Sequence, residues 1–196
     1  MNTEIFSSPN SLDRIDPASF HAHSEIIVEI SDTQSHMQVD YLFLRRVVSE
    51  TLLANEVNGA AISIALVDDT GIQAINRRHL GHDWPTDVIT FALSEPADET
   101  LAGEVIVSAE MAATTARKAF VSPSDELALY VVHGLLHLCG YDDSTADDRC
   151  VMRRREGEVL ARLGLPNTFP AVLAEVPSSA GQTNDAGERE RARWTV

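Results

Sequence analysis

HGLLHLCGYDD, residues 133–143, joins two histidines in an apolar run to a glycine turn and a pair of aspartates. Residues i and i+4 of a helix lie one turn apart on the same face, so His133 and His137 can direct two imidazoles at one point. Gly140 tolerates the backbone geometry of a turn that brings the chain back. The pattern predicts a helix that carries half of a metal site, with Asp143 as the third ligand.

Several details favour a metal site over a chance pair of histidines. Gly134 lies inside the helical pattern at a cost of about 1 kcal/mol relative to alanine, which indicates a close approach to the backbone. The flanking residues are strongly apolar, so an unpaired histidine pair would carry a desolvation cost. Asp142 is the alternative to Asp143 as third ligand. Cys139 lies two residues after His137 on the same helix, so its thiol is expected to point elsewhere.

Further blocks accompany this segment in a fixed order. HGLLHLCGYDD resembles the signature HGxLHLxGYDH of the YbeY family of bacterial ribosome-maturation endoribonucleases. PTDVITF (85–91) and GEVIVS (103–108) are similar to the family blocks PTDVLSF and GDIVIS, and MRRRE (152–156) follows in the expected place. We therefore expect a YbeY-like domain over 25–165, with tails at 1–24 and 166–196 whose polar composition predicts disorder.

The resemblance implies a function. It implies a metal-dependent, single-strand-specific endoribonuclease that uses zinc and acts in 16S rRNA 3′-end maturation and ribosome quality control. The implied partners are single-stranded or ribosomal RNA, the small ribosomal subunit, and a ribosomal protein or an assembly GTPase. Two alternatives stay open: a non-catalytic, metal-binding ribosome assembly factor, and a metal-dependent hydrolase of a small amide or ester. The sequence does not choose between water and an RNA 2′-hydroxyl as nucleophile.

The metal motif departs from two known patterns. Family members carry a histidine as the third ligand, where this chain has Asp143. A carboxylate makes the site harder, so Mn²⁺ or Fe²⁺ is possible as well as Zn²⁺. In zincin proteases the residue after the first histidine is the general base glutamate of HExxH, and here it is Gly134. We therefore do not expect peptidase activity.

A further departure concerns catalysis. Family members typically carry an arginine five residues before the proline of the PTDV block, and the matching residue here is Leu80. The resemblance gives Leu80 no role. We expect Arg78, two residues upstream, to be the catalytic substitute. The alternatives are Arg77, His79 and His82.

Composition limits how the chain could meet RNA. The formal net charge of −15 argues against electrostatic wrapping of nucleic acid, whose non-specific binding depends on phosphate neutralisation. RNA contacts must therefore be local, and basic side chains on helices that flank the metal motif could supply them. Aromatic residues are scarce at 6%, which leaves Trp84 and Tyr141 as candidates for base stacking.

Length, cysteines and termini limit the class of protein. A chain of 196 residues with 44% hydrophobic residues suits one domain with a sizeable core. Two cysteines without a CxxC pair form no disulfide framework, as expected of a cytoplasmic protein. The first residues have neither a basic nor an apolar signal region, and no stretch reaches eighteen apolar residues, so we expect neither export nor a membrane span.

Periodicity predicts the order of secondary structure. Strands are expected where apolar residues alternate or run continuously, and helices where they recur every three to four residues. Together they predict an α+β domain with a roughly four-stranded mixed sheet packed by about five helices, one of them the zincin-like metal helix. The predicted strands are 25–30, 60–67, 86–93 and 103–108; the predicted helices are 39–57, a short one from about 69, 109–120, the metal helix from 122 or 123, and 144 or 145 to 163.

Overall fold

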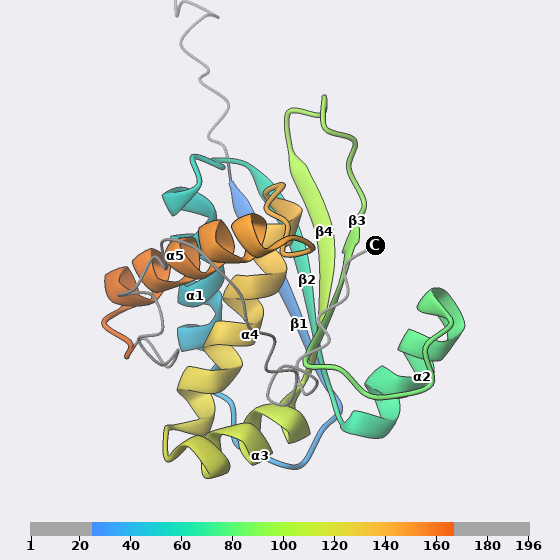
Figure 1. The fold of residues 1–196 in the computed structure, drawn as a ribbon. Helices are drawn as coiled ribbons and strands as arrows, with labels where there is room; N and C mark the ends of the chain where they lie inside the picture. The colour runs from blue at the N-terminus through green and yellow to red at the C-terminus, as the bar shows by residue number, and fades with distance from the viewer. Residues whose placement is uncertain (1–24, 167–196) are drawn as a thin grey trace, which may run out of the picture.

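The fold was analysed in a computed structural model, which describes residues 25–166. Four strands and five helices lie within this range (Figure 1). The predicted tails at 1–24 and 166–196 fall outside it, apart from Pro166. In chain order the elements are β1 (Ile26–Asp32), α1 (Tyr41–Ala54), β2 (Ala60–Val67), α2 (Asp69–Leu80), β3 (Val88–Ala92), β4 (Leu101–Ser108), α3 (Ala109–Ala119), α4 (Pro123–Leu138) and α5 (Ala146–Leu163).

The strands form one mixed sheet in the order β1-β2-β4-β3. β1, β2 and β4 run parallel, and β3 pairs antiparallel with β4, with Val88 opposite Val107. β1 and β3 are therefore the two edges. The parallel pairs require crossover connections, which α1 provides between β1 and β2.

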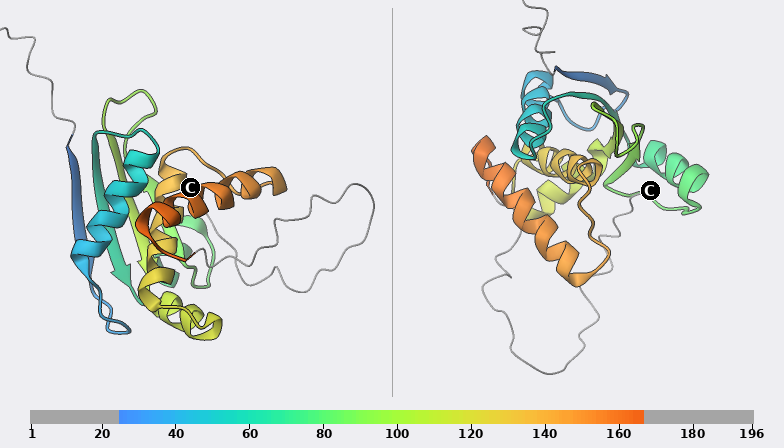
Figure 2. Two further views of the ribbon diagram at one scale, coloured as in Figure 1. Left: turned by 90° about the vertical axis from the view of Figure 1, so that its left-hand side faces the viewer. Right: turned by 90° about the horizontal axis from the view of Figure 1, so that it is seen from above.

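Helices cover the two faces of the sheet unequally (Figures 1 and 2). Alternate residues of β2, from Ala60 to Leu66, are buried against the large core that α1, α4 and α5 share with the sheet. The opposite face carries α2, whose Ile72 packs with Ile89 and Ile106 in a second, smaller cluster. Within residues 25–166 no helix is long and apolar enough to cross a membrane.

The predicted fold class is confirmed, and most boundaries agree within a few residues. α4 begins as expected, with Ser122 as the N-cap and Pro123 in the first turn. β3 starts at Val88 instead of 86, because Asp87 turns its carboxylate onto the N–H of Val88 and the hydroxyl of Thr86. α2 begins at Asp69, as expected, and Asp68 is its N-cap, because the Asp68 side chain accepts the N–H of Gly71.

Gly134 lies where α4 meets the sheet. A β-carbon added there would lie 2.7 Å from Val105 Cγ1, 3.0 Å from Val88 Cγ2 and 3.1 Å from Thr90 Oγ1. The missing side chain therefore lets α4 approach β3 and β4, as the helical glycine predicted. A glutamate could not fit at this position, so the fold itself excludes the general base of an HExxH protease.

We predict that Gly134→Ala destabilises the protein although alanine is the better helix former. Overpacking a tight core costs about 1–3 kcal/mol, which exceeds the ~1 kcal/mol that alanine gains in helix propensity. Thermal unfolding followed by circular dichroism should show a lower Tm. Adding Val105→Ala, which removes the nearest methyl group, should restore part of the stability that Gly134→Ala loses. Adding Val107→Ala, a change at a buried residue of the same strand, should lower the stability further by its own cost. A Gly134→Ala protein as stable as the wild type would contradict the close approach.

Candidate metal centre

The fold brings His133, His137 and Asp143 together as predicted. One ligand atom from each of the three lies within 4.8 Å of the others. The histidines project from one face of α4, and Asp143 comes from the loop between α4 and α5. The side chain of His133 is 1% exposed, that of His137 3% and that of Asp143 16%, so the group opens to solvent on the Asp143 side.

The distances between the ligand atoms are close to those that a small cation requires. The Nε2 atoms of His133 and His137 lie 2.9 Å apart. Asp143 places Oδ2 at 3.8 Å from His133 Nε2 and Oδ1 at 4.0 Å from His137 Nε2. In a tetrahedral site with metal–ligand bonds of about 2.0–2.1 Å, ligand atoms are about 3.3 Å apart. The observed distances lie on both sides of that value, so small side-chain movements would seat an ion.

The Nδ1 atoms of both histidines are held by groups outside the cluster. His137 Nδ1 lies 2.9 Å from the carbonyl oxygen of Tyr141, which can only accept, so this nitrogen carries the proton. His133 Nδ1 lies 2.5 Å from Oε1 of Glu156, a carboxylate of α5 that is fully buried. These contacts leave the two Nε2 atoms as the nitrogens that face each other inside the cluster. A cation there would accept an electron pair from each, so the residues fit a metal ion.

The loop from 139 to 145 is built to hold Asp143. Gly140 adopts a left-handed φ of 90° directly after α4, which turns the chain back. Arg149, on α5, donates to the carbonyl oxygens of Asp143 and Ser144. Asp142, the alternative ligand, instead accepts from the Ser144 hydroxyl and from two backbone N–H groups. The pKa of Asp142 is lowered, chiefly by the hydrogen bond from the Ser144 hydroxyl. The Asp142 carboxylate lies outside the group formed by His133, His137 and Asp143.

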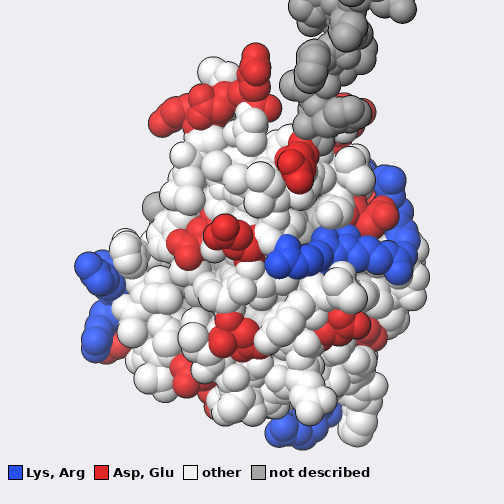
Figure 3. Space-filling model, turned by 180° about the vertical axis from the view of Figure 1, so that it is seen from behind, with Lys and Arg blue, Asp and Glu red and all other residues white. Residues whose placement is uncertain are grey.

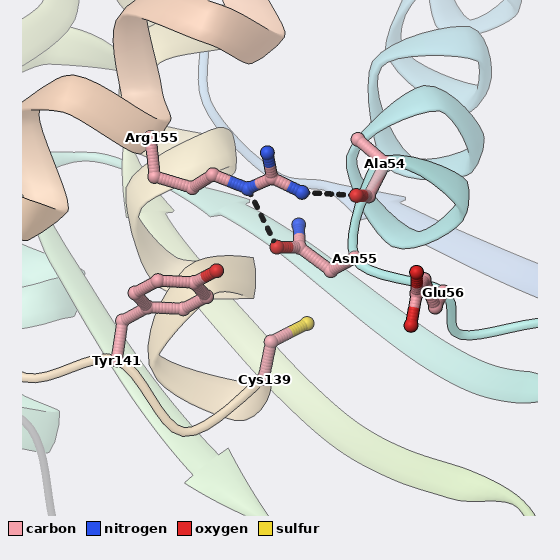
Figure 4. Close-up of a pocket in the computed structure, with 6 residues that line it drawn as sticks. All are labelled: Ala54, Asn55, Glu56, Cys139, Tyr141 and Arg155. Carbon is pink, nitrogen blue, oxygen red and sulfur yellow. Dashed lines mark hydrogen bonds between the residues drawn. The ribbon is translucent and has the colours of Figure 1, made fainter.

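A hollow of about 200 Å³ lies beside this loop, between α5 and the end of α1 (Figure 4). Cys139 and Tyr141 line it with Arg155, whose guanidinium donates to Asn55 Oδ1 and to the carbonyl oxygen of Ala54. Arg155 therefore caps the C-terminal end of α1. Burial raises the pKa of Cys139 to about 11, so near neutral pH its thiol is protonated and a poor metal ligand.

Basic residues are dispersed rather than gathered into one surface. On the face opposite to that of Figure 1, Lys and Arg form separate groups among Asp and Glu, one of them over α2 at the left edge (Figure 3). Some basic side chains bind the backbone: Arg45 donates to the carbonyl oxygen of Val28 on edge strand β1. A continuous basic groove is therefore absent from this view, in keeping with a net charge of −15.

The arginines of α2 differ in direction. Arg77 and Arg78 are both exposed in the last turn of α2. At about 100° per residue, Arg77 lies about 60° from Leu80 around the helix and Arg78 about 160° from it. Arg77 also reaches Asp83, with 3.8 Å between Nη1 and Oδ1. Arg77 therefore faces the loop after Leu80, and the catalytic role of Arg78 stays a prediction.

Two residues of the site were missed in the sequence. Glu156 was noted only as the last residue of the MRRRE block and Arg149 was given no role, although Glu156 holds His133 and Arg149 holds the Asp143 loop. Glu156 occupies a helix position where the pattern predicts a buried side chain. Charged residues are rarely fully buried unless they are paired, so this position was the available signal for a partner.

Comparisons with known proteins show the family of this chain. The sequence model of the family Endoribonuclease YbeY matches residues 28–164. The chain is 37% identical to Endoribonuclease YbeY of Carboxydothermus hydrogenoformans over 71% of its own length and 99% of that protein. It is 38% identical to Endoribonuclease YbeY of Syntrophotalea carbinolica over 70% of its own length and 95% of that protein.

The fold has a counterpart among solved structures. The solution structure of TM1509 from Thermotoga maritima aligns with a TM-score of 0.50 and 22% identity, covering 76% of this chain and all of that one. At that identity the likeness concerns the fold alone. The family match spans most of the described residues and includes the predicted ligands, and from it we conclude that this chain belongs to the YbeY endoribonuclease family.

Proposed function

We propose that this protein is a metal-dependent endoribonuclease that cuts single-stranded RNA, with His133, His137 and Asp143 as the ligands of one divalent ion. The observation that carries the proposal is the orientation of the two imidazoles, whose Nε2 atoms face each other at 2.9 Å while their Nδ1 atoms are bound elsewhere. Membership of an endoribonuclease family supports RNA as the substrate.

Three protein ligands leave a position open for water or substrate. A bound zinc ion would lower the pKa of its water to about 7 and polarise a phosphoryl oxygen. The protein's own part is to hold both histidines in one tautomer, to keep the inner side of the site dry, and to leave the Asp143 side open to a strand. His133 and His137 lie too deep to approach a ribose directly, so we assign them to binding the ion.

Zinc is the ion we propose, since two imidazoles and a carboxylate suit it. Asp143 also admits Mn²⁺ or Fe²⁺. In the cell we propose that the substrate is ribosomal RNA on or near the small ribosomal subunit in the cytoplasm, and that cleavage serves 16S rRNA 3′-end maturation and ribosome quality control. A ribosomal protein or an assembly GTPase is the proposed protein partner.

We predict one stoichiometric metal ion in the purified wild type and cleavage of a single-stranded RNA that depends on it. His137→Ala and Asp143→Ala should lose both, because two ligands cannot hold the ion tightly. Asp143→His should keep both, since imidazole is an alternative ligand with good zinc affinity. Elemental analysis and gel electrophoresis of end-labelled RNA measure the two quantities, and Asp142→Ala is the matched control.

The panel also separates the alternatives. Metal retained in Asp143→Ala would show that the third ligand is misassigned. A metal-loaded wild type that cuts no RNA would favour a non-catalytic assembly factor. Cleavage of a small ester or amide instead of RNA would favour the small-molecule hydrolase.

We further predict that Glu156→Gln weakens metal binding without unfolding the protein. The buried carboxylate accepts from His133 Nδ1 and makes Nε2 a better donor to the ion, and loss of such an outer partner costs about 10–100-fold in metal affinity. Competition with a chromogenic chelator gives the dissociation constant. Glu158→Gln, an exposed neighbour paired with Arg155, is the matched control. Equal zinc affinity in Glu156→Gln and the wild type would contradict the positioning role.

A further inference from the structure

An aromatic pair lies on the surface between α2 and β3. The rings of His82 and Trp84 are stacked, with centroids 4.7 Å apart and planes at 14°. Trp84 is nevertheless 45% exposed. Since His82 covers one ring face, the solvent-exposed part of the indole includes the other face or its edges. The arrangement leaves a large aromatic surface available for a planar ligand.

The loop that carries this pair is held from both ends. The buried side chain of Asn76 donates through Nδ2 to the carbonyl oxygen of Trp84 at 2.8 Å. Gln73 donates to the carbonyl oxygen and the carboxylate of Asp83. Gly81 turns the chain at a φ of 75°, and Asp87 fixes the far end against β3. An exposed tryptophan in a pinned loop loses little conformational freedom when a ligand binds.

This aromatic pair and the metal centre lie on either side of one edge strand. β3 ends the sheet, α4 packs on one face of it through Gly134, and α2 packs on the other through Ile89. The loop 81–87 enters β3 directly. A strand of RNA that crosses the edge of β3 would therefore pass from the aromatic pair on the α2 side of the sheet to the side on which α4 carries the metal ligands His133 and His137.

The charges around the pair suit a nucleic acid strand. Arg77 and Arg78 are exposed in the last turn of α2, and Arg77 Nη1 lies 3.8 Å from Oδ1 of Asp83. This ion pair is exposed on both sides, so it is weak and can open to a phosphate.

We propose that the His82–Trp84 pair binds a nucleobase of the single-stranded substrate, with Arg77 on the neighbouring phosphate. The inference rests on the proposed function and adds to it the part of the substrate that is held by stacking. Every base has a π-face, so the contact would grip the strand with little sequence preference. It would also provide affinity that does not depend on a strongly basic surface.

The test uses the fluorescence of Trp84 in the full chain, with Trp194→Phe to remove the other tryptophan. A single-stranded oligoadenylate of about ten nucleotides, a length within the range of single-strand sites, is titrated in EDTA so that it is not cut. We expect quenching by the RNA and none by an abasic ribose-phosphate strand of equal length. Trp84→Ala should weaken binding about ten-fold in fluorescence polarisation, and Trp84→Phe should lose less.

Controls separate stacking from charge and from unfolding. Phe120→Ala removes an aromatic ring that is 97% exposed elsewhere on the surface and should leave the affinity unchanged. Trp84→Ala should keep the salt dependence of binding, whereas Arg77→Gln should reduce its slope by about one. Circular dichroism should give the same melting profile for Trp84→Phe and the wild type.

Equal quenching by the abasic strand, or wild-type affinity in Trp84→Ala, would overturn the stacking site. If the metal-loaded wild type still cuts RNA in that case, the proposed function survives. A wild type that neither binds nor cuts RNA would overturn both.

Discussion

The close approach of α4 to the sheet at Gly134 is the constraint on which the site depends. With no side chain at this position, the helix backbone lies against Val105, Val88 and Thr90. That contact fixes the rotation of α4 about its own axis. His133, adjacent to Gly134, and His137, three residues after it, then project beside the contact and not into solvent. A single-residue property therefore determines where two metal ligands point.

Fixing the helix does not by itself fix the imidazoles, which can still rotate and exchange tautomers. The carboxylate of Glu156 and the carbonyl oxygen of Tyr141 remove that freedom, because each binds one Nδ1 atom. One partner comes from α5 and the other from the loop after α4. Because Arg149 of α5 also holds the loop at Asp143, all the groups that orient the ligands depend on how α5 packs. The site is thus completed by the last helix of the domain.

The sequence predicted local features well and long-range ones poorly. The i,i+4 histidines, the glycine turn and the helix caps depend on neighbours in the chain, and the structure has them where expected. The sheet order β1-β2-β4-β3 places β4 between β2 and β3, and this order depends on the pairing of β2 with β4, which lie far apart in the chain and whose pairing periodicity does not encode. Glu156 was overlooked for the same reason, since its partner is 23 residues away.

The sequence predicted that basic side chains on helices near the metal motif would contact the RNA phosphates. Basic side chains near the ligand loop prove to be engaged with the backbone: Arg149 with Asp143 and Ser144, and Arg155 with the end of α1. Such arginines already donate to carbonyl oxygens, so turning to a phosphate would cost these hydrogen bonds. In a chain with 30 acidic and 15 basic residues, few cations remain to meet a phosphodiester at the ligand cluster.

This scarcity gives the proposed ion two tasks. Besides activating the nucleophile, it would be the main positive charge that a bound phosphate meets at the reaction centre. Asp143 in place of a neutral histidine lowers the net charge of a divalent site by one, which makes that attraction weaker. Affinity for the strand must then come largely from contacts away from the reacting phosphate. An uncharged contact such as base stacking is suited to that purpose, because it is insensitive to the acidic surroundings that would oppose a purely electrostatic grip.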